Sequence, residues 1–317
     1  MNTALGTLPI LATLIALLVP PLLSGCLWLP MNDWQHAVWS DDGEGVAFVQ
    51  RSFEGQNLID FNRGPNTSER DHEFEIYTSS LSSPDNSTQL AGPFTGNLVG
   101  LYFMASAGYL VAGRATTPSP YEGDEAPATE SYDLIDLDGT VTSIAAVDYL
   151  WHGLQCEDEG VWLQNDGVVD VIPSPDGSIL ARLVAGLTCE DTLPVQSVTL
   201  SFLEAPGLQA IGEPLFIDTG VLPEGNECCV RSGWLADGSF AITGLGWEFP
   251  DREQEGWLIE PGGEPVWGAL PGEDCLEPPT TSSVFRADGM RVWIDGDGTL
   301  GFEDEEDNPE VFGCDTR

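Results

Sequence analysis

A short polar turn that ends in glycine recurs along the chain, each time between two apolar runs. The clearest copy is VIPSPDGSILARL at residues 171–183, where Asp176-Gly177 separates the runs. Asp-Gly between such runs predicts a tight hairpin, because glycine adopts a positive φ without strain. Related stretches surround four more glycines, so that Gly43, Gly108, Gly177, Gly238 and Gly289 are 65, 69, 61 and 51 residues apart. This spacing indicates a repeated structural unit.

Further strands are predicted after each hairpin. The candidates are residues 72–81, 130–139, 196–204 and 255–263, and two of them run through another glycine turn into a fourth strand. A four-stranded antiparallel unit cannot bury its faces alone, whereas stacked units can. We therefore expect an all-β fold, a β-propeller of four-stranded antiparallel blades. Five units are visible, and the number of blades stays open between five and seven. Tandem β-sandwiches are the alternative.

The repeat also resembles that of a known class of proteins. SPDGSILARL and its copies resemble the S-P-D-G-x-x-[IL]-A-F repeat of TolB-like propellers, relatives of the WD-repeat propellers. The resemblance implies a single propeller domain over residues 34–317. In a four-stranded meander, the glycine turns and the turns between the third and fourth strands share one rim. The other connections belong to the opposite rim, where the sequence predicts long loops at residues 51–71, 114–130, 186–196 and 244–256.

The first residues carry the features of an export signal. Residues 1–25 hold a long apolar stretch that ends at a cysteine, which is typical of a secretory signal peptide. The string Leu23-Ser24-Gly25-Cys26 resembles the lipobox of bacterial lipoproteins. The resemblance implies cleavage before Cys26, lipidation of its thiol and a short tether at residues 26–33. It also implies a membrane-anchored protein that faces the periplasm or the cell surface, with the outer membrane favoured because Leu27 is not Asp.

An exported location changes what the remaining cysteines predict. An even number of cysteines in an oxidising compartment indicates disulfides, whereas no C-x-x-C pair supports a zinc site. Their pairing stays open, because six cysteines allow 15 connectivities. The disulfide candidates are Cys156, Cys189, Cys228, Cys229, Cys275 and Cys314.

The acidic residues exclude nucleic acids as partners, and the spacing of some of them suggests Ca²⁺. The chain has 52 acidic and 10 basic residues, a net charge of −42, which repels the phosphates of nucleic acids. The stretch DGDGTLGFEDEE has carboxylates at spacing that suits Ca²⁺, with the candidate ligands Asp295, Asp297, Glu303 and Glu306. However, Leu300 stands where an EF-hand loop needs glycine. We interpret the stretch as an acidic hairpin, with Ca²⁺ binding as the alternative and no other cofactor expected.

Two functional hypotheses remain. The sequence has no nucleophile elbow and no evident partner for its three histidines, which favours a non-catalytic binding or scaffold protein of the cell envelope. Its partner would be an envelope protein or a glycan, and Trp247, in a long loop, is the candidate for contact with a ligand. The alternative is a secreted hydrolase or lyase of the propeller type, with or without Ca²⁺, since propellers host both kinds of function.

Overall fold

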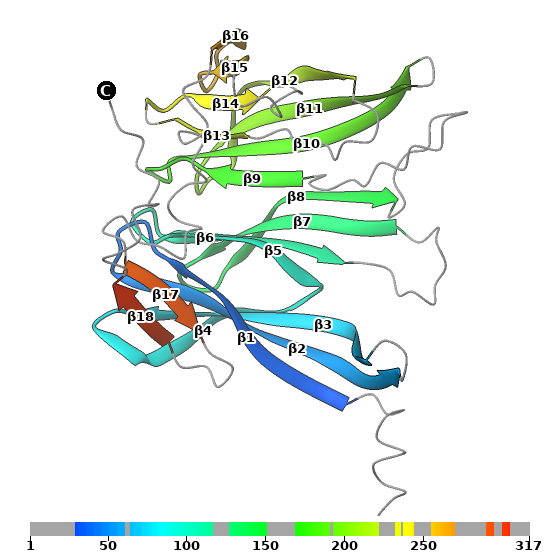
Figure 1. The fold of residues 1–317 in the computed structure, drawn as a ribbon. Coiled ribbons are helices and arrows are strands. Elements are labelled where there is room, and N and C mark those ends of the chain that lie inside the picture. Colours follow the sequence, from blue (N-terminus) through cyan, green and yellow to red (C-terminus); the bar gives the residue numbers. More distant parts are fainter. Residues whose placement is uncertain are drawn as a thin grey trace, which may run out of the picture.

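The computed structural model describes residues 29–60, 64–116, 127–150, 169–190, 193–221, 232–235, 237–243, 255–269, 290–294 and 300–304. These residues form strands and turns, which confirms the predicted all-β class. Four sheets contain four antiparallel strands each, paired in the order of the chain, and a two-stranded sheet follows them. Figure 1 shows the sheets stacked one after another.

The strands have the following bounds. Sheet 1 consists of β1 (Leu29–Trp39), β2 (Gly45–Asp60), β3 (Gly64–Ser80) and β4 (Ser83–Thr95). Sheet 2 consists of β5 (Asn97–Met104), β6 (Tyr109–Thr116), β7 (Pro127–Asp136) and β8 (Val141–Leu150). Sheet 3 consists of β9 (Val169–Pro173), β10 (Ile179–Glu190), β11 (Leu193–Glu204) and β12 (Gln209–Val221). Sheet 4 consists of β13 (Ser232–Trp234), β14 (Phe240–Thr243), β15 (Glu255–Ile259) and β16 (Val266–Ala269). The separate C-terminal hairpin consists of β17 (Met290–Ile294) and β18 (Leu300–Asp304).

Four of the five predicted glycine turns join the first and second strands of a sheet. Each of these glycines has a positive φ, between 68° and 84°, a conformation that residues with a Cβ rarely adopt. The turn at Gly289 lies outside the described residues. The four glycines are Gly43, Gly108, Gly177 and Gly238. The repeat seen in the sequence is therefore a repeat of hairpins.

Both kinds of short turn lie at the same end of a sheet, as predicted. In sheets 1, 2 and 3, the turn after the third strand donates a backbone N–H to a carbonyl of the glycine turn. The pairs are Leu81 with Glu44 (2.9 Å), Leu137 with Gly108 (3.2 Å) and Ala205 with Ser178 (2.9 Å). We call this end of the sheets the turn rim.

Two of the predicted long loops are wrong. Residues 51–71 and 186–196 are mostly strand, because β2 pairs with β3 as far as Asp60 and Gly64, and β10 pairs with β11 as far as Glu190 and Leu193. Residues 51–71 are largely polar and lack a sustained apolar alternation, so this stretch resembles a loop. Residues 187–190 and 193–196 do alternate, and only Asp191, Thr192 and Pro194 suggest a loop there. In both stretches the backbone pairing continues. Residues 29–33, in the segment predicted as a tether, already belong to β1 and pair with β2.

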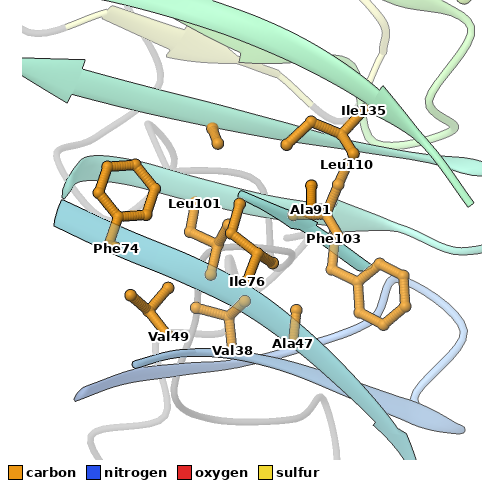
Figure 2. Close-up of a cluster of buried hydrophobic side chains, with 11 residues drawn as sticks. Val38, Ala47, Val49, Phe74, Ile76, Ala91, Leu101, Phe103, Leu110 and Ile135 are labelled. Carbon is orange, nitrogen blue, oxygen red and sulfur yellow. The ribbon is translucent and has the colours of Figure 1, made fainter. Parts of the chain in front are cut away.

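Three apolar clusters join consecutive sheets. The cluster in Figure 2 lies between sheets 1 and 2, with Val49, Phe74 and Ile76 facing Leu101 and Ile135. A second cluster joins sheets 2 and 3, and a third joins sheets 3 and 4. Sheets 2 and 3 therefore bury one face against the preceding sheet and the other against the next, which single four-stranded units need for stability.

The last described strands pack at the beginning of this series. Val292 of the C-terminal hairpin is buried against Trp39 and Phe48 of sheet 1, on the face away from sheet 2. The indole of Trp39 donates a hydrogen bond to the carbonyl of Met290 (3.1 Å). The order of packing is therefore C-terminal hairpin, sheet 1, sheet 2, sheet 3, sheet 4 (Figure 1). A closed ring is not seen in the described residues, and tandem sheets fit them as well.

Candidate functional site

The turn rim is held together by its own side chains. The Ser174 hydroxyl donates to the carboxylate of Asp176 (2.7 Å) and accepts the N–H of Ile179 (3.0 Å). In sheet 1, Ser40 does the same with Asp42 (2.6 Å) and Gly45 (2.8 Å). Hydrogen bonds, first of all the one from Ser174, hold the pKa of Asp176 below its usual range. The carboxylates accept hydrogen bonds from groups of their own turns, so their role at the turn rim is to stabilise the hairpins.

Charged side chains gather in the other half of the sheets. In sheet 1, Arg51 of β2 lies directly opposite Asp33 of β1 and binds both of its carboxylate oxygens, at 2.9 and 2.7 Å. The guanidinium also lies over the ring of Phe53, 4.3 Å from its centroid. A bidentate ion pair of this kind fixes the orientation of both side chains, and each charge is neutralised by the other.

His36 departs from the regular course of β1. It has a φ of 54° at a bulge between Gln35 and Val38, where the register of β1 against β2 shifts. Much of its side chain is exposed. Desolvation of the imidazole by its neighbours nevertheless lowers the pKa of His36, the charge of Arg51 lowers it further, and Asp33 opposes both effects. His36 is therefore neutral at pH 7.

A second ion pair lies between sheets 1 and 2. Arg114 of β6 binds Asp133 of β7 (Nε to Oδ2, 3.0 Å), and the Asp133 side chain is only 5% exposed. Arg114 also lies over the ring of Phe94 from sheet 1, 5.8 Å from its centroid. A buried carboxylate needs such a partner, because leaving it alone in the interior would cost several kcal/mol, roughly 3–5. The pair therefore serves packing between the two sheets.

A carboxyl group and two phenols meet between sheets 2 and 3. Asp170, the second residue of β9, lies at the end of the strand away from the turn rim. It accepts a hydrogen bond from the Tyr132 hydroxyl of β7. Burial raises the pKa of Asp170 to about 6, although the hydrogen bonds from Tyr132 and the Val171 N–H act in the opposite direction. Burial likewise raises the pKa values of Tyr102 and Tyr132, and the charge of Asp170 adds to both shifts. We call these three residues the Asp170 cluster.

A glycine makes room for the Asp170 cluster. The ring of Tyr132 lies over Gly113, its partner on β6, so closely that a Cβ at position 113 would overlap the ring atoms. The same face of sheet 3 presents Arg182, whose guanidinium donates to the Ser201 hydroxyl (3.3 Å). Among the described residues, its Nε is buried with no hydrogen-bond partner. The interface between sheets 2 and 3 thus combines apolar packing with a few fixed polar groups.

These groups do not form a recognisable catalytic constellation. Asp33, Asp133 and Asp170 lie on three different strands, and each is bonded to an Arg or Tyr of the protein. Within the described ranges, no three His, Cys, Asp or Glu side chains come close enough together to hold a metal ion. The charged groups described here are therefore paired within the sheets.

Most of the residues predicted from sequence lie outside the described residues. This is so for Cys26, Trp247, Asp295, Asp297 and Glu306, and for the cysteines Cys156, Cys228, Cys229, Cys275 and Cys314. Cys189 lies in β10 opposite Pro194, and Glu303 lies in β18 opposite Arg291. The disulfide and Ca²⁺ predictions therefore stay predictions. In the part of the chain that is described, no helix is long and apolar enough to cross a membrane.

Sequence analysis missed the exposed apolar residues on the outer strands. Phe216 of β12 is 71% exposed, and Val266 and Trp267 of β16 are 62% and 47% exposed. The local pattern around them is that of an ordinary strand. Only their place at the edge of a sheet sets them apart, and that place depends on the strand order. Comparison with known proteins finds no family model that matches the chain and no curated protein with significant sequence similarity.

Proposed function

We propose that this protein is a lipid-anchored, extracytoplasmic β-propeller that binds a protein or glycan of the cell envelope without catalysing a reaction. The anchor is the lipid on Cys26, and the export signal is residues 1–25. These two assignments rest on the sequence, whereas the binding role rests on the shape of the sheets.

The observation that carries the binding role is the difference between the two ends of the sheets. At the turn rim the connections are short and bonded internally. At the other end, β2 and β3 extend beyond their neighbours: β1 pairs only as far as Gly55 and β4 only as far as Glu73. β10 and β11 continue to Glu190 and Leu193, beyond β9, which pairs only to Val184, and are followed on the other side by β12, which pairs with β11 as far as Val195. We call these extensions the β2–β3 arm and the β10–β11 arm. Extended loops and hairpins on a rigid scaffold are common binding elements.

The packing of the C-terminal hairpin supports the closed propeller. Without the C-terminal hairpin, the outer face of sheet 1 would lie in water. Instead, Trp39 and Phe48 on that face pack against Val292, 244 residues after Phe48 in the chain. Contact between the first and last units is what closure of a ring requires. We therefore include β17 and β18 in a fifth blade, which would lie between sheets 4 and 1.

A site-specific cross-linking experiment tests the binding role. A photoreactive amino acid is placed at Asn57, in the β2–β3 arm, and in a second variant at Gly207, where a Cβ would meet open space on the turn rim. After irradiation of native envelopes, we expect adducts from position 57 and none from position 207. In a third variant, residues 56–68 are removed and the photoreactive amino acid is placed at Gly55. This shortened arm should no longer form an adduct with the same partner. Equal adducts at both positions, or none in the arm, would contradict the proposal.

The anchor is tested separately. Replacing Cys26 with serine should move the protein from the membrane fraction to the soluble fraction and remove the incorporation of a labelled fatty acid. Retention of the unlipidated variant in the membrane would contradict the anchor and leave the binding role intact, so the two parts of the proposal can fail independently.

A further inference from the structure

The outer edge of sheet 4 is a regular, apolar strand. Among the described residues, β16 is the last strand of the sheet and pairs only with β15, without a register shift, from Glu255 opposite Ala269 to Leu258 opposite Val266. Its sequence is Val-Trp-Gly-Ala, with no charge and no proline. Every second residue of an edge strand directs its N–H and C=O away from the sheet, where another strand can bind them.

The outer edges of the other four-stranded sheets are protected. β4 contains Pro84 and Pro93 and has three register shifts against β3. β12 contains Pro214 and two register shifts. β8 has a shift at Tyr132 and exposes Thr142 and Ser143. Prolines, bulges and polar side chains are the usual means by which proteins prevent strands from adding to an edge. β16 has none of the three, and only its short length limits it.

An aromatic pair supports this edge. Trp267 of β16 lies opposite Trp257 of β15, with ring centroids 5.0 Å apart and planes at 76°. Trp257 packs against the apolar cluster between sheets 3 and 4, together with Ile211 and Leu215. Trp267 is therefore held in place by a partly buried neighbour although it is itself 47% exposed. An exposed indole with a fixed orientation can contact a bound chain with little further loss of entropy.

The charge around β16 selects the kind of partner. Between Glu255 and Ala269 there are three acidic residues, Glu255, Glu260 and Glu264, and no basic residue. Glu260 and Glu264 are exposed, as is Glu213 of β12, which follows Gly212 where that strand meets Gly262. A second copy of a chain with a net charge of −42 would be repelled. A cationic chain would be attracted and guided to the edge.

We propose that β16 binds an extended, cationic segment of a partner protein by strand addition. The segment pairs with the outward backbone groups of β16. Its apolar side chains contact Trp267 on one face and Val266 on the other, since neighbouring strand residues point to opposite faces. Its Lys or Arg side chains lie near Glu260, Glu264 and Glu213. This site is separate from the two arms and does not depend on the proposed function.

The test uses a short fluorescein-labelled peptide in which valine alternates with lysine, and measures its binding to the full chain by fluorescence polarisation. We expect saturable binding that weakens as salt is added, and no binding of the same peptide with glutamate in place of lysine. Val266→Lys should weaken binding by about tenfold or more, because it places a like charge against the peptide at the edge. Phe216→Lys is the matched control: it makes the same change at a more exposed position on β12, and should alter binding by less than about twofold.

Two further outcomes decide the mode of binding. A peptide methylated on alternate backbone nitrogens keeps its side chains and its charge but cannot pair as a strand, so we expect it not to bind. Equal binding of the methylated peptide would overturn strand addition, as would equal losses in the two lysine variants. Self-association of the chain without peptide, lost in Val266→Lys, would show that the edge binds a second copy instead. Near-ultraviolet circular dichroism verifies that both variants are folded.

Discussion

Asp170 is a carboxylic acid in a buried environment that disfavours its charged form. Its carboxyl group lies between two sheets, bonded to Tyr132, and burial raises its pKa to about 6. No cation is among the groups that shift this pKa. In the folded protein, the carboxyl group therefore holds its proton at pH values at which the unfolded chain has lost it, and the charged form opposes folding.

We predict that Asp170→Asn changes how stability depends on pH. Because the folded-state pKa is above the unfolded value of 3.8, the folded state binds more protons between about pH 4 and pH 6. Wild-type stability therefore falls as the pH rises through this window, and the loss is complete above the folded pKa. Asparagine does not titrate, but its oxygen can still accept from Tyr132. From pH 7 down to pH 4, the wild type should gain up to about 3 kcal/mol relative to the variant.

Urea denaturation of both proteins at a series of pH values measures this difference. Subtracting the variant from the wild type cancels the titration of the other carboxylates, which is large in so acidic a chain. A difference that is constant between about pH 4 and pH 7 would show that Asp170 is solvated like an ordinary surface carboxylate.

At the scale of the element, the glycine turn explains why the repeat is visible in the sequence. In two copies a serine, an aspartate two residues later and the backbone N–H five residues later form the same hydrogen bonds. In sheet 4, Leu235 replaces the serine, and Asp237 binds only the N–H and hydroxyl of Ser239. The remaining described copy, around Gly108, has no aspartate but keeps the positive φ. Backbone conformation is therefore more constant than side-chain bonding.

We predict that Ser174→Ala lowers the free energy of unfolding by about 1–2 kcal/mol, because the hydroxyl is buried and its loss leaves the Ile179 N–H without its acceptor. Ser178→Ala is the control. Its hydroxyl is exposed, and its N–H can still bind Asp176, so the change should be within about 0.5 kcal/mol. Urea midpoints at a fixed pH measure both values. Equal losses would mean that any hydroxyl near Asp176 serves the turn.

These elements also show what could be predicted from the sequence. Turn chemistry is local, so Asp176-Gly177 and its copies identify the hairpins and, through them, the order of strands. The sequence of the β2–β3 arm predicts a loop because it is largely polar, whereas the backbone pairing of its strands needs no apolar pattern. The bond between Asp170 and Tyr132 joins two sheets, and neither residue stands out among its neighbours in the chain. Contacts of this kind depend on packing, which a single sequence does not encode in any short pattern.

At the scale of the whole molecule, the question is whether the series of sheets closes. Sheets 1, 2 and 3 each share apolar clusters with a neighbour on both faces, whereas among the described residues sheet 4 shares one with sheet 3 alone. On the other face of sheet 4, Leu235 and Ala241 form a small buried cluster of their own, with Leu258 packed against it. A ring would cover that face with the unit that contains the C-terminal hairpin. In a ring, each unit supports two neighbours, so that loss of one unit weakens both. In an open series, loss of the C-terminal hairpin weakens sheet 1 alone.

We predict from the closed propeller that Val292→Asp lowers protection from hydrogen exchange in sheets 1 and 4 together. Val292 is 1% exposed against Trp39 and Phe48, and an unpaired carboxylate there would cost several kcal/mol and detach the C-terminal hairpin. Exchange measured by mass spectrometry should then rise in β1–β2 and in β13–β14. The β9–β12 peptides serve as the internal control, because in the described part of the chain sheet 3 shares no apolar cluster with the hairpin or with sheet 1. Faster exchange in β1–β2 with unchanged exchange in β13–β14 would instead indicate an open stack of tandem sheets. In such a stack the hairpin does not stabilise sheet 4.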